Sequence, residues 1–159
     1  MDKFCQSEKV YELVTIEEDI ECLPSKKVCK EFIKEKCIEI PPQKPKIEEL
    51  AKIIIKPIVT SHKIIKTKEG FKVIVQGKII EKVFYVADKP EQSVHSAKFC
   101  FPFCNFIKLP NKYKNVKDVK VNIEDVIIQL TEKRRICQCI LICICAIPDK
   151  DYCHSDCDC

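Results

Sequence analysis

Cysteine and isoleucine alternate through residues 136–145, and this alternation limits what the chain can fold into. In the stretch CQCILICIC, residues 137–145, four cysteines and Leu141 share one parity, while the isoleucines share the other parity, which only Gln138 interrupts. Successive side chains of a β-strand point to opposite faces. The pattern therefore predicts a strand with one isoleucine face that packs a core and one cysteine face that serves another purpose.

Similar strand patterns recur along the chain, rich in β-branched residues and broken by Pro, Asn, Asp or Gly. The expected strands lie near residues 9–16, 36–40, 50–67, 71–87, 93–107, 116–130 and 134–147. Residues 26–37 are also compatible with a short helix, although their apolar period is weak. About seven strands without alternating helices predict an all-β fold, a single antiparallel β-sandwich.

Two of these stretches carry finer signals. In AKFCFPFCNF the three phenylalanines 99, 101 and 103 share one face. We expect this face to be core, so that Cys100 and Cys104 point away from it.

In VKVNIEDVIIQL the apolar parity switches between Ile123 and Val126, which predicts a β-bulge near residues 124–125.

The proline-rich stretch PPQKP, residues 41–45, divides the chain. We expect an N-terminal arm over residues 1–45 with one or two strands, a sandwich over 46–147, and a short cysteine-rich tail over 148–159. The arm segment KVYELVTI alternates well enough to add as a strand to an exposed sheet edge of the next subunit.

Composition excludes several classes of function. The chain has only two glycines, whereas phosphate-cradling loops need several. Its net charge of +4 comes from interleaved Lys and Glu, and the only arginines are Arg134 and Arg135, so we expect no nucleic-acid partner. No apolar run reaches the roughly 20 residues that a membrane helix needs, so we expect no membrane association. We also expect no cofactor.

The thirteen cysteines of the 159-residue chain and its N-terminal sequence indicate different cellular compartments. Such a content is typical of extracellular proteins, yet the chain opens MDKFCQSEKVYE, without the pattern of a signal peptide. An odd number also leaves at least one cysteine free, metal-bound or paired with another chain. Some pairs are expected within the chain, for example between strands 93–107 and 134–147 if these are neighbours, and one or two cysteines are expected to be buried.

All thirteen cysteines are candidates for disulfides to another molecule: Cys5, Cys22, Cys29, Cys37, Cys100, Cys104, Cys137, Cys139, Cys143, Cys145, Cys153, Cys157 and Cys159. Metal binding is a weaker alternative, with its best candidates in the tail: Cys153, His154, Cys157 and Cys159. Cysteines two apart on a strand are expected to lie too far apart to share one metal ion. No thiol is singled out beside an oriented base, so we predict no catalytic residue, and we expect His95 to be a hydrogen-bonded structural histidine.

Residues 73–110 resemble the SPOCS domain family of spore-forming Firmicutes. The resemblance rests on VQGKIIEKVFYVAD at 75–88, QSVHSAKF at 92–99 and PFCNFI at 102–107, and it extends more weakly over 46–147. The family includes the C-terminal region of a morphogenetic protein that binds the coat-organising ATPase. Its members typically carry polar residues where this chain has Cys100 and Cys104.

The resemblance resolves the conflict, because spore-surface proteins are made in the mother-cell cytoplasm and are released when that cell lyses. It implies a structural, non-enzymatic protein of the coat, exosporium or an appendage. We expect it to form a filament or lattice by strand addition and intermolecular disulfides, alone or together with other coat proteins. Two alternatives remain open: an adaptor that binds the coat-organising ATPase, and a Cys/His metal-binding protein.

Overall fold

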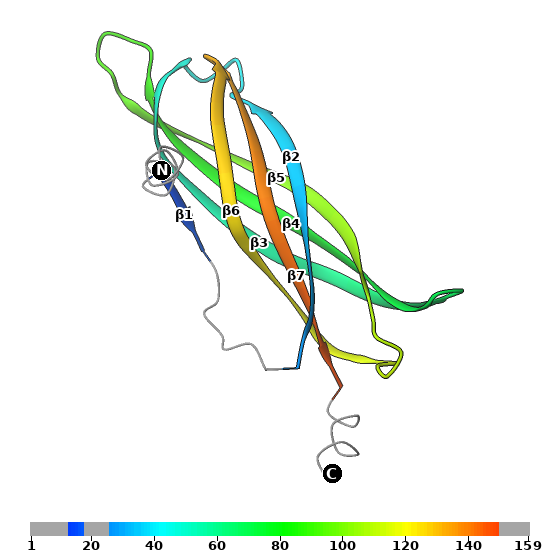
Figure 1. Ribbon diagram of the computed structural model, residues 1–159. Coiled ribbons are helices and arrows are strands. Elements are labelled where there is room, and N and C mark those ends of the chain that lie inside the picture. The colour runs from blue at the N-terminus through cyan, green and yellow to red at the C-terminus, as the bar shows by residue number, and fades with distance from the viewer. Residues whose placement is uncertain (1–12, 18–25, 150–159) are drawn as a thin grey trace, which may run out of the picture.

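The computed structural model describes residues 13–17 and 26–149, which fold into a two-layer β-sandwich (Figure 1). The strands are β1 (Val14–Ile16), β2 (Val28–Glu39), β3 (Ile47–Thr67), β4 (Gly70–Ala87), β5 (Val94–Lys108), β6 (Val116–Glu132) and β7 (Arg135–Pro148). The prediction of an all-β sandwich is confirmed. In the part of the chain that the structure describes, no helix is both long and apolar enough to cross a bilayer.

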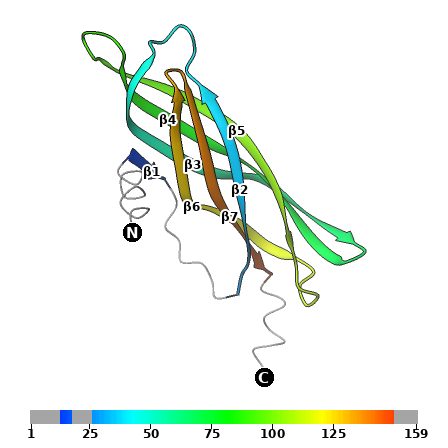
Figure 2. The same cartoon turned by 45° about the horizontal axis from the view of Figure 1, so that its top comes forward.

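The two sheets differ in size. One has four strands in the order β1-β3-β4-β5, and the other has three in the order β2-β7-β6. All pairs are antiparallel except the short β1–β3 pair, which is parallel. Figure 2 shows the three-stranded sheet lying across the four-stranded sheet at an angle. The chain contributes β2 to the smaller sheet, builds most of the larger sheet, and then returns with β6 and β7.

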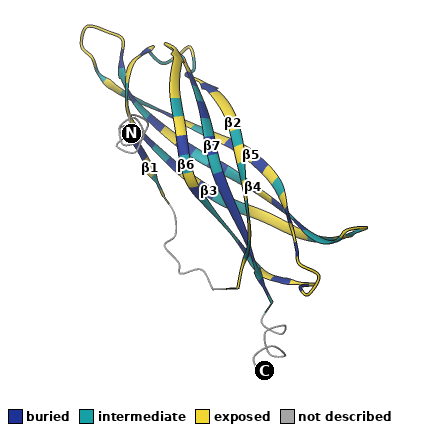
Figure 3. Ribbon diagram, in the orientation of Figure 1, coloured by how far each residue is buried: buried dark blue, intermediate teal, exposed yellow. Residues whose placement is uncertain are grey.

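The core lies between the sheets and follows the predicted parities. The isoleucines of β7, residues 136, 140, 142 and 144, are fully buried. Figure 3 shows β7 coloured as buried or intermediate over most of its length. Phe101 and Phe103 of β5 are 3 % exposed, so their side of the strand is core as expected. Burying side chains of this size contributes about 1.5–3 kcal/mol each, which makes this apolar layer the main stabilising element of the fold.

Residues 28–39 form one long strand, and the short helix is not present there. Every second side chain from Val28 to Lys34 is half-buried, and those between are exposed. The charged Nζ atoms of Lys30 and Lys36 lie over the rings of Phe106 and Phe101 of β5, 3.6 Å and 6.0 Å from the ring centroids, so these lysines make cation–π contacts with apolar surface. Because lysines occupy positions on the inner side of β2, the alternation of this strand was not recognisable from residue type in the sequence.

The stretch 41–45 connects β2 in one sheet to β3 in the other. Arg134 Nη1 donates hydrogen bonds to the carbonyl oxygens of Pro41 and Lys44, at 2.9 Å and 2.7 Å. Tyr85 Oη donates a 2.7 Å hydrogen bond to the carbonyl oxygen of Pro45. The stretch is therefore a fixed crossover between layers, and the sandwich begins before residue 46.

Strand β1 lies at the edge of the four-stranded sheet. Its residues Val14–Ile16 pair with Ile53–Ile55 of β3 in the same chain, and Glu17 N donates a 2.8 Å hydrogen bond to the carbonyl oxygen of Ile55. The N-terminal region thus adds a strand to an exposed edge, as its alternation predicted, but here the edge belongs to its own chain.

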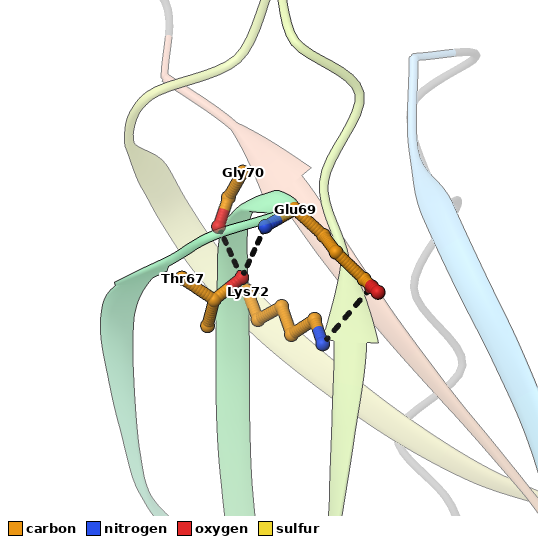
Figure 4. A network of polar contacts seen from close by, with 4 residues as sticks. All are labelled: Thr67, Glu69, Gly70 and Lys72. Carbon is orange, nitrogen blue, oxygen red and sulfur yellow. Dashed lines mark hydrogen bonds and ion pairs between the residues drawn. The ribbon is translucent and has the colours of Figure 1, made fainter.

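The turn between β3 and β4 is shown in Figure 4. Thr67 Oγ1 donates a 2.8 Å hydrogen bond to the Gly70 carbonyl oxygen and accepts one of 3.3 Å from Glu69 N. Gly70 has φ +112°, a conformation that side chains rarely tolerate. Glu69 also pairs with Lys72 at 3.6 Å. The turn accounts for one of the two glycines of the chain.

The bulge predicted near residues 124–125 is confirmed. The register between β6 and β7 shifts between Ile123, which lies opposite Ile142, and Asp125, which lies opposite Leu141. The extra residue, Glu124, is exposed on the outer side of β6.

Candidate functional site

Two disulfides join β2 to β7. In their antiparallel register Cys29 lies opposite Cys145 and Cys37 lies opposite Cys137, and both pairs are bridged. The Cα atoms of the pairs are 4.1 Å and 4.0 Å apart. The two bridges are eight positions apart on each strand, so β2 is tied to β7 near both of its ends.

These bridges correct two expectations from the sequence. Cys29, Cys37, Cys137 and Cys145 were candidates for disulfides to another molecule, but each has a partner directly opposite it within the chain. The suggested internal pairing of strands 93–107 and 134–147 is also wrong, because β5 and β7 lie in different sheets. The physical reason is the non-local pairing of β2 with β7, which residue patterns do not encode.

Four described cysteines are free. Cys100 and Cys104 are exposed on β5, on the side away from the core, as predicted. Cys139 is half-buried and Cys143 is buried on β7. Cys100 and Cys104 therefore meet the first requirement for disulfides to another molecule, which is access.

A cluster of three sulfurs lies at one end of the β2–β7 pair. The Sγ atoms of Cys143 and Cys145 are 3.7 Å apart, and the Sγ of Cys29 lies within 4.8 Å of both. The expectation that cysteines two apart on a strand cannot converge is wrong here, because the side chains lean toward each other and toward the neighbouring strand. Burial raises the pKa of the Cys143 thiol, and the carboxylates of Glu124 and Glu31 raise it further.

Carboxylates accompany both free cysteines of β7. Glu31 lies opposite Cys143 and Glu35 lies opposite Cys139 in the β2–β7 register. Glu31, Glu124 and Cys143 have ligand atoms within 4.8 Å of one another, and Cys139 Sγ lies 3.8 Å from Glu35 Oε1. Among the described residues, only the cluster around Cys143 brings three sulfurs within 4.8 Å of one another.

The outer face of the four-stranded sheet is rich in lysine. Register and alternation place the following charged residues on this surface, which we call the lysine face: Glu49, Lys52, Lys56, Lys63, Lys72, Lys78, Lys82, Lys98 and Lys108. Lys82 and Lys98 lie directly opposite each other, an arrangement that destabilises an isolated sheet. Cys100 and Cys104 belong to the same face.

The outer face of the three-stranded sheet has the opposite character. We call it the acidic face, and its charged residues are Glu31, Glu35, Glu39, Asp118, Lys120, Glu124, Asp125, Glu132 and Arg135. Lys120 pairs with Asp118 at 3.3 Å, and Arg135 lies opposite both Glu39 and Glu132. Glu31 and Glu35 have no cation opposite them in the register and face cysteines instead.

This separation of charge is not visible in the sequence alone. Lys and Glu are interleaved along the chain, and the net charge of +4 gave no sign of two oppositely charged surfaces. The signal was present in the strand parity of residues 72–108, where every outward-facing charged residue is lysine. Reading it required knowing which strands share a sheet.

His95 has the structural role that we expected. Its Nε2 lies 2.9 Å from Ser93 Oγ, and its ring stacks on Tyr85 with centroids 5.9 Å apart. The remaining candidates lie outside the described residues: Cys5, Cys22, Cys153, His154, Cys157 and Cys159. Their proposed roles, including the tail metal site, stay predictions.

Comparison with known families adds one finding. Residues 46–131 match the family described as SipL, SPOCS domain. No curated protein and no solved structure matches the chain. The matched region spans β3 to β6 and contains only two of the thirteen cysteines, Cys100 and Cys104. Both disulfides and the sulfur cluster are built by residues on either side of it.

Proposed function

This chain belongs to the SPOCS domain family, and on that premise we propose that it is a structural protein of the bacterial spore surface that assembles with copies of itself. The family gives the chain a role related to the spore coat, as a structural or adaptor domain rather than an enzyme. Self-assembly in the coat, exosporium or an appendage is the more specific function proposed here.

The observation that carries the proposal is that the two outer faces have opposite charges and that each of them also carries free cysteines. The lysine face presents Cys100 and Cys104, which are exposed and free, while the acidic face presents Cys139, which is half-buried and free. Stacking the lysine face of one molecule on the acidic face of the next joins unlike charges and brings cysteines from both surfaces together. Because the two surfaces differ, such contacts are head-to-tail and continue into a filament or lattice.

The charge pattern supports this contact over a structural role for the lysines. Like charges directly opposite on a sheet destabilise it, so the Lys82–Lys98 pair lowers the stability of the isolated molecule. Carboxylates of a neighbouring molecule remove that penalty. Complementary potentials also favour one mutual orientation and accelerate association.

Strand exchange offers a second connection. The β1–β3 pair involves only three residues of β1, at the edge of the larger sheet. If β1 of one molecule occupies the β3 edge of its neighbour, the same hydrogen bonds form between molecules instead of within one. Domain swapping of this kind costs little free energy, because each backbone hydrogen bond that is lost within a molecule is regained between two molecules. Disulfides from the N-terminal cysteines would then lock the exchange.

Non-reducing gel electrophoresis of boiled assemblies tests the proposal. The wild-type protein should give a ladder that collapses with reductant. The double variant Cys100→Ser/Cys104→Ser should lose most of that ladder, whereas Cys143→Ser, which removes a buried thiol, should keep it. An unchanged ladder in the double variant would show that the lysine face carries no intermolecular disulfide.

The adaptor function remains the second candidate because of where the match lies. The matched residues 46–131 exclude β2, β7 and eleven of the thirteen cysteines. An adaptor needs only the matched surface, and its complex with the coat-organising ATPase should survive Cys100→Ser/Cys104→Ser. Electron microscopy of the protein alone separates the two functions, since only self-assembly produces filaments or lattices without a partner.

A further inference from the structure

The cleft beside the sulfur cluster combines ligands that a metal ion would use. It has a volume of about 610 Å³ and lies between β3, β6 and β7. Its lining includes three cysteines and a carboxylate from the β6 bulge: Cys29, Cys143, Cys145 and Glu124. The three sulfurs lie within 4.8 Å of one another, and the Glu124 carboxylate lies within 4.8 Å of the Cys143 sulfur.

The spacing of the sulfurs fits tetrahedral zinc coordination. Zinc–sulfur bonds are about 2.3 Å long, which puts two thiolates of a tetrahedral site about 3.8 Å apart. With the bridge intact, the Sγ atoms of Cys143 and Cys145 are already 3.7 Å apart. Cys29 and Cys145 are bonded to each other, so both of their sulfurs must first be released by reduction.

We propose that reduction of the Cys29–Cys145 bridge creates a site for a thiophilic divalent cation such as Zn²⁺, held by the three cysteine sulfurs and by the carboxylate of Glu124. The bridge and the metal site exclude each other, because Cys29 and Cys145 cannot be bonded together and ligate the ion at once. This inference goes beyond self-assembly and does not depend on it.

The two states interconvert by balanced steps. Two equivalents of a small-molecule thiol supply two electrons and two protons to the bridge, giving two protein thiols and one small-molecule disulfide. Zn²⁺ then binds as the three thiols release their protons to solvent, and the ion stays divalent throughout. In the reverse direction a small-molecule disulfide accepts two electrons from Cys29 and Cys145, and the ion leaves.

The bulge positions the carboxylate. Glu124 is the extra residue of β6, and Asn122 Nδ2 donates a 2.9 Å hydrogen bond to its Oε1. Such an outer contact orients a ligand before the metal arrives. Glu31 adds a second negative charge next to Cys143 and favours a cation there.

The other bridge provides a natural comparison. Cys37–Cys137 also has a free cysteine two residues along β7, Cys139, with Glu35 beside it. Among the described residues, no third sulfur gathers at that end of the sheet within ligand distance. Cys139→Ser and Glu35→Gln are therefore matched controls for Cys143→Ser and Glu124→Gln.

Zinc titration of the full chain tests the inference. Cys153→Ser/Cys157→Ser/Cys159→Ser serves as the background, so that the tail cannot bind the ion. After reduction with a phosphine, competition with a chromophoric chelator should show one Zn²⁺ per chain, which is absent before reduction. Cys143→Ser and Glu124→Gln should each weaken binding at least about tenfold, and both controls should bind as the background does.

A second measurement protects the test against misfolding. Co²⁺ bound by thiolates in a tetrahedral site absorbs visible light strongly, and this band should fall in Cys143→Ser while the circular dichroism of the sheet is unchanged. Equal zinc binding before and after reduction, or equal binding by Cys143→Ser and Cys139→Ser, overturns the proposed site.

Discussion

Gln138 Nε2 donates a 2.5 Å hydrogen bond to Glu81 Oε1 across the interior of the sandwich. The two residues come from different sheets, and they are 4 % and 0 % exposed. Burial raises the pKa of Glu81 to about 7, and the hydrogen bond from Gln138 lowers it in part. The one residue that interrupts the isoleucine face of β7 is thus the polar partner of a carboxyl group buried on β4.

Glu81 makes the stability of the fold depend on pH. A carboxyl group whose pKa is higher in the folded chain than in the unfolded chain holds its proton more tightly when folded. Its contribution is therefore fully present below about pH 4.5 and is lost as the pH rises to about 7, a change of roughly 3 kcal/mol. Urea unfolding at pH 5 and pH 8 should show lower stability at pH 8. Glu81→Gln should remove most of this difference, and an unchanged pH profile in that variant would contradict the assignment.

The two glycines should respond differently to alanine. A Cβ at Gly77 would overlap the ring of Phe103 and the carbonyl oxygen of Ile58, whereas at Gly70 the nearest atom, Asn111 Oδ1, is 3.4 Å away. Gly77→Ala should therefore cost about 3 kcal/mol or more through overpacking. Gly70→Ala should cost about 1–2 kcal/mol, since only its positive φ is strained. Thermal unfolding of both variants checks this order, and a smaller loss at Gly77 would mean that the Phe103 ring and the β3 backbone shift easily at that point.

The two disulfides should stabilise the fold non-additively. They close loops of 116 and 100 residues between the same two strands, so either bridge alone still restrains most of the unfolded chain. Removing one, by Cys37→Ser/Cys137→Ser or by Cys29→Ser/Cys145→Ser, should cost about 3 kcal/mol. Removing both should cost more than the sum, as urea unfolding without reductant can measure. Strict additivity would indicate that the bridges restrain different parts of the unfolded chain.

Reversing charge on the lysine face should weaken assembly without unfolding the molecule. Lys82→Glu/Lys98→Glu replaces one like-charged pair by another, so the repulsion inside the sheet is kept while attraction to the acidic face is lost. Light scattering should show slower and weaker assembly. Raising the ionic strength from 0.1 M to 1 M should weaken wild-type assembly in the same way, since the screening length falls from about 10 Å to about 3 Å.

Lys89→Glu/Lys114→Glu, which changes two loop residues outside both faces, is the matched control for that prediction. It changes the net charge by the same amount at two exposed positions outside the lysine face. It should assemble like the wild type. Equal loss of assembly in both variants would mean that net charge, rather than the contact between the two faces, controls association.

Much of the architecture was predictable because strand parity is a local property. In extended backbone each side chain points opposite to its neighbours, so the sequence itself separates the Ile face of β7 from its cysteine face and places Cys100 outside. The bulge at Glu124 is local in the same sense, since it shifts the parity within a few residues. Gln138 was visible as an interruption, although its partner was not.

Only the tertiary structure decided which strands are neighbours. The pairing of β2 with β7 joins residues about 100 positions apart, and it fixed both disulfides, the convergence of Cys29, Cys143 and Cys145, and the assignment of residues 28–39 to a strand. The charge of each outer face was likewise decided when the strands were sorted into two sheets. Long-range pairing depends on the packing of the whole core, which balances loop closure against apolar burial, so no short stretch of sequence contains it.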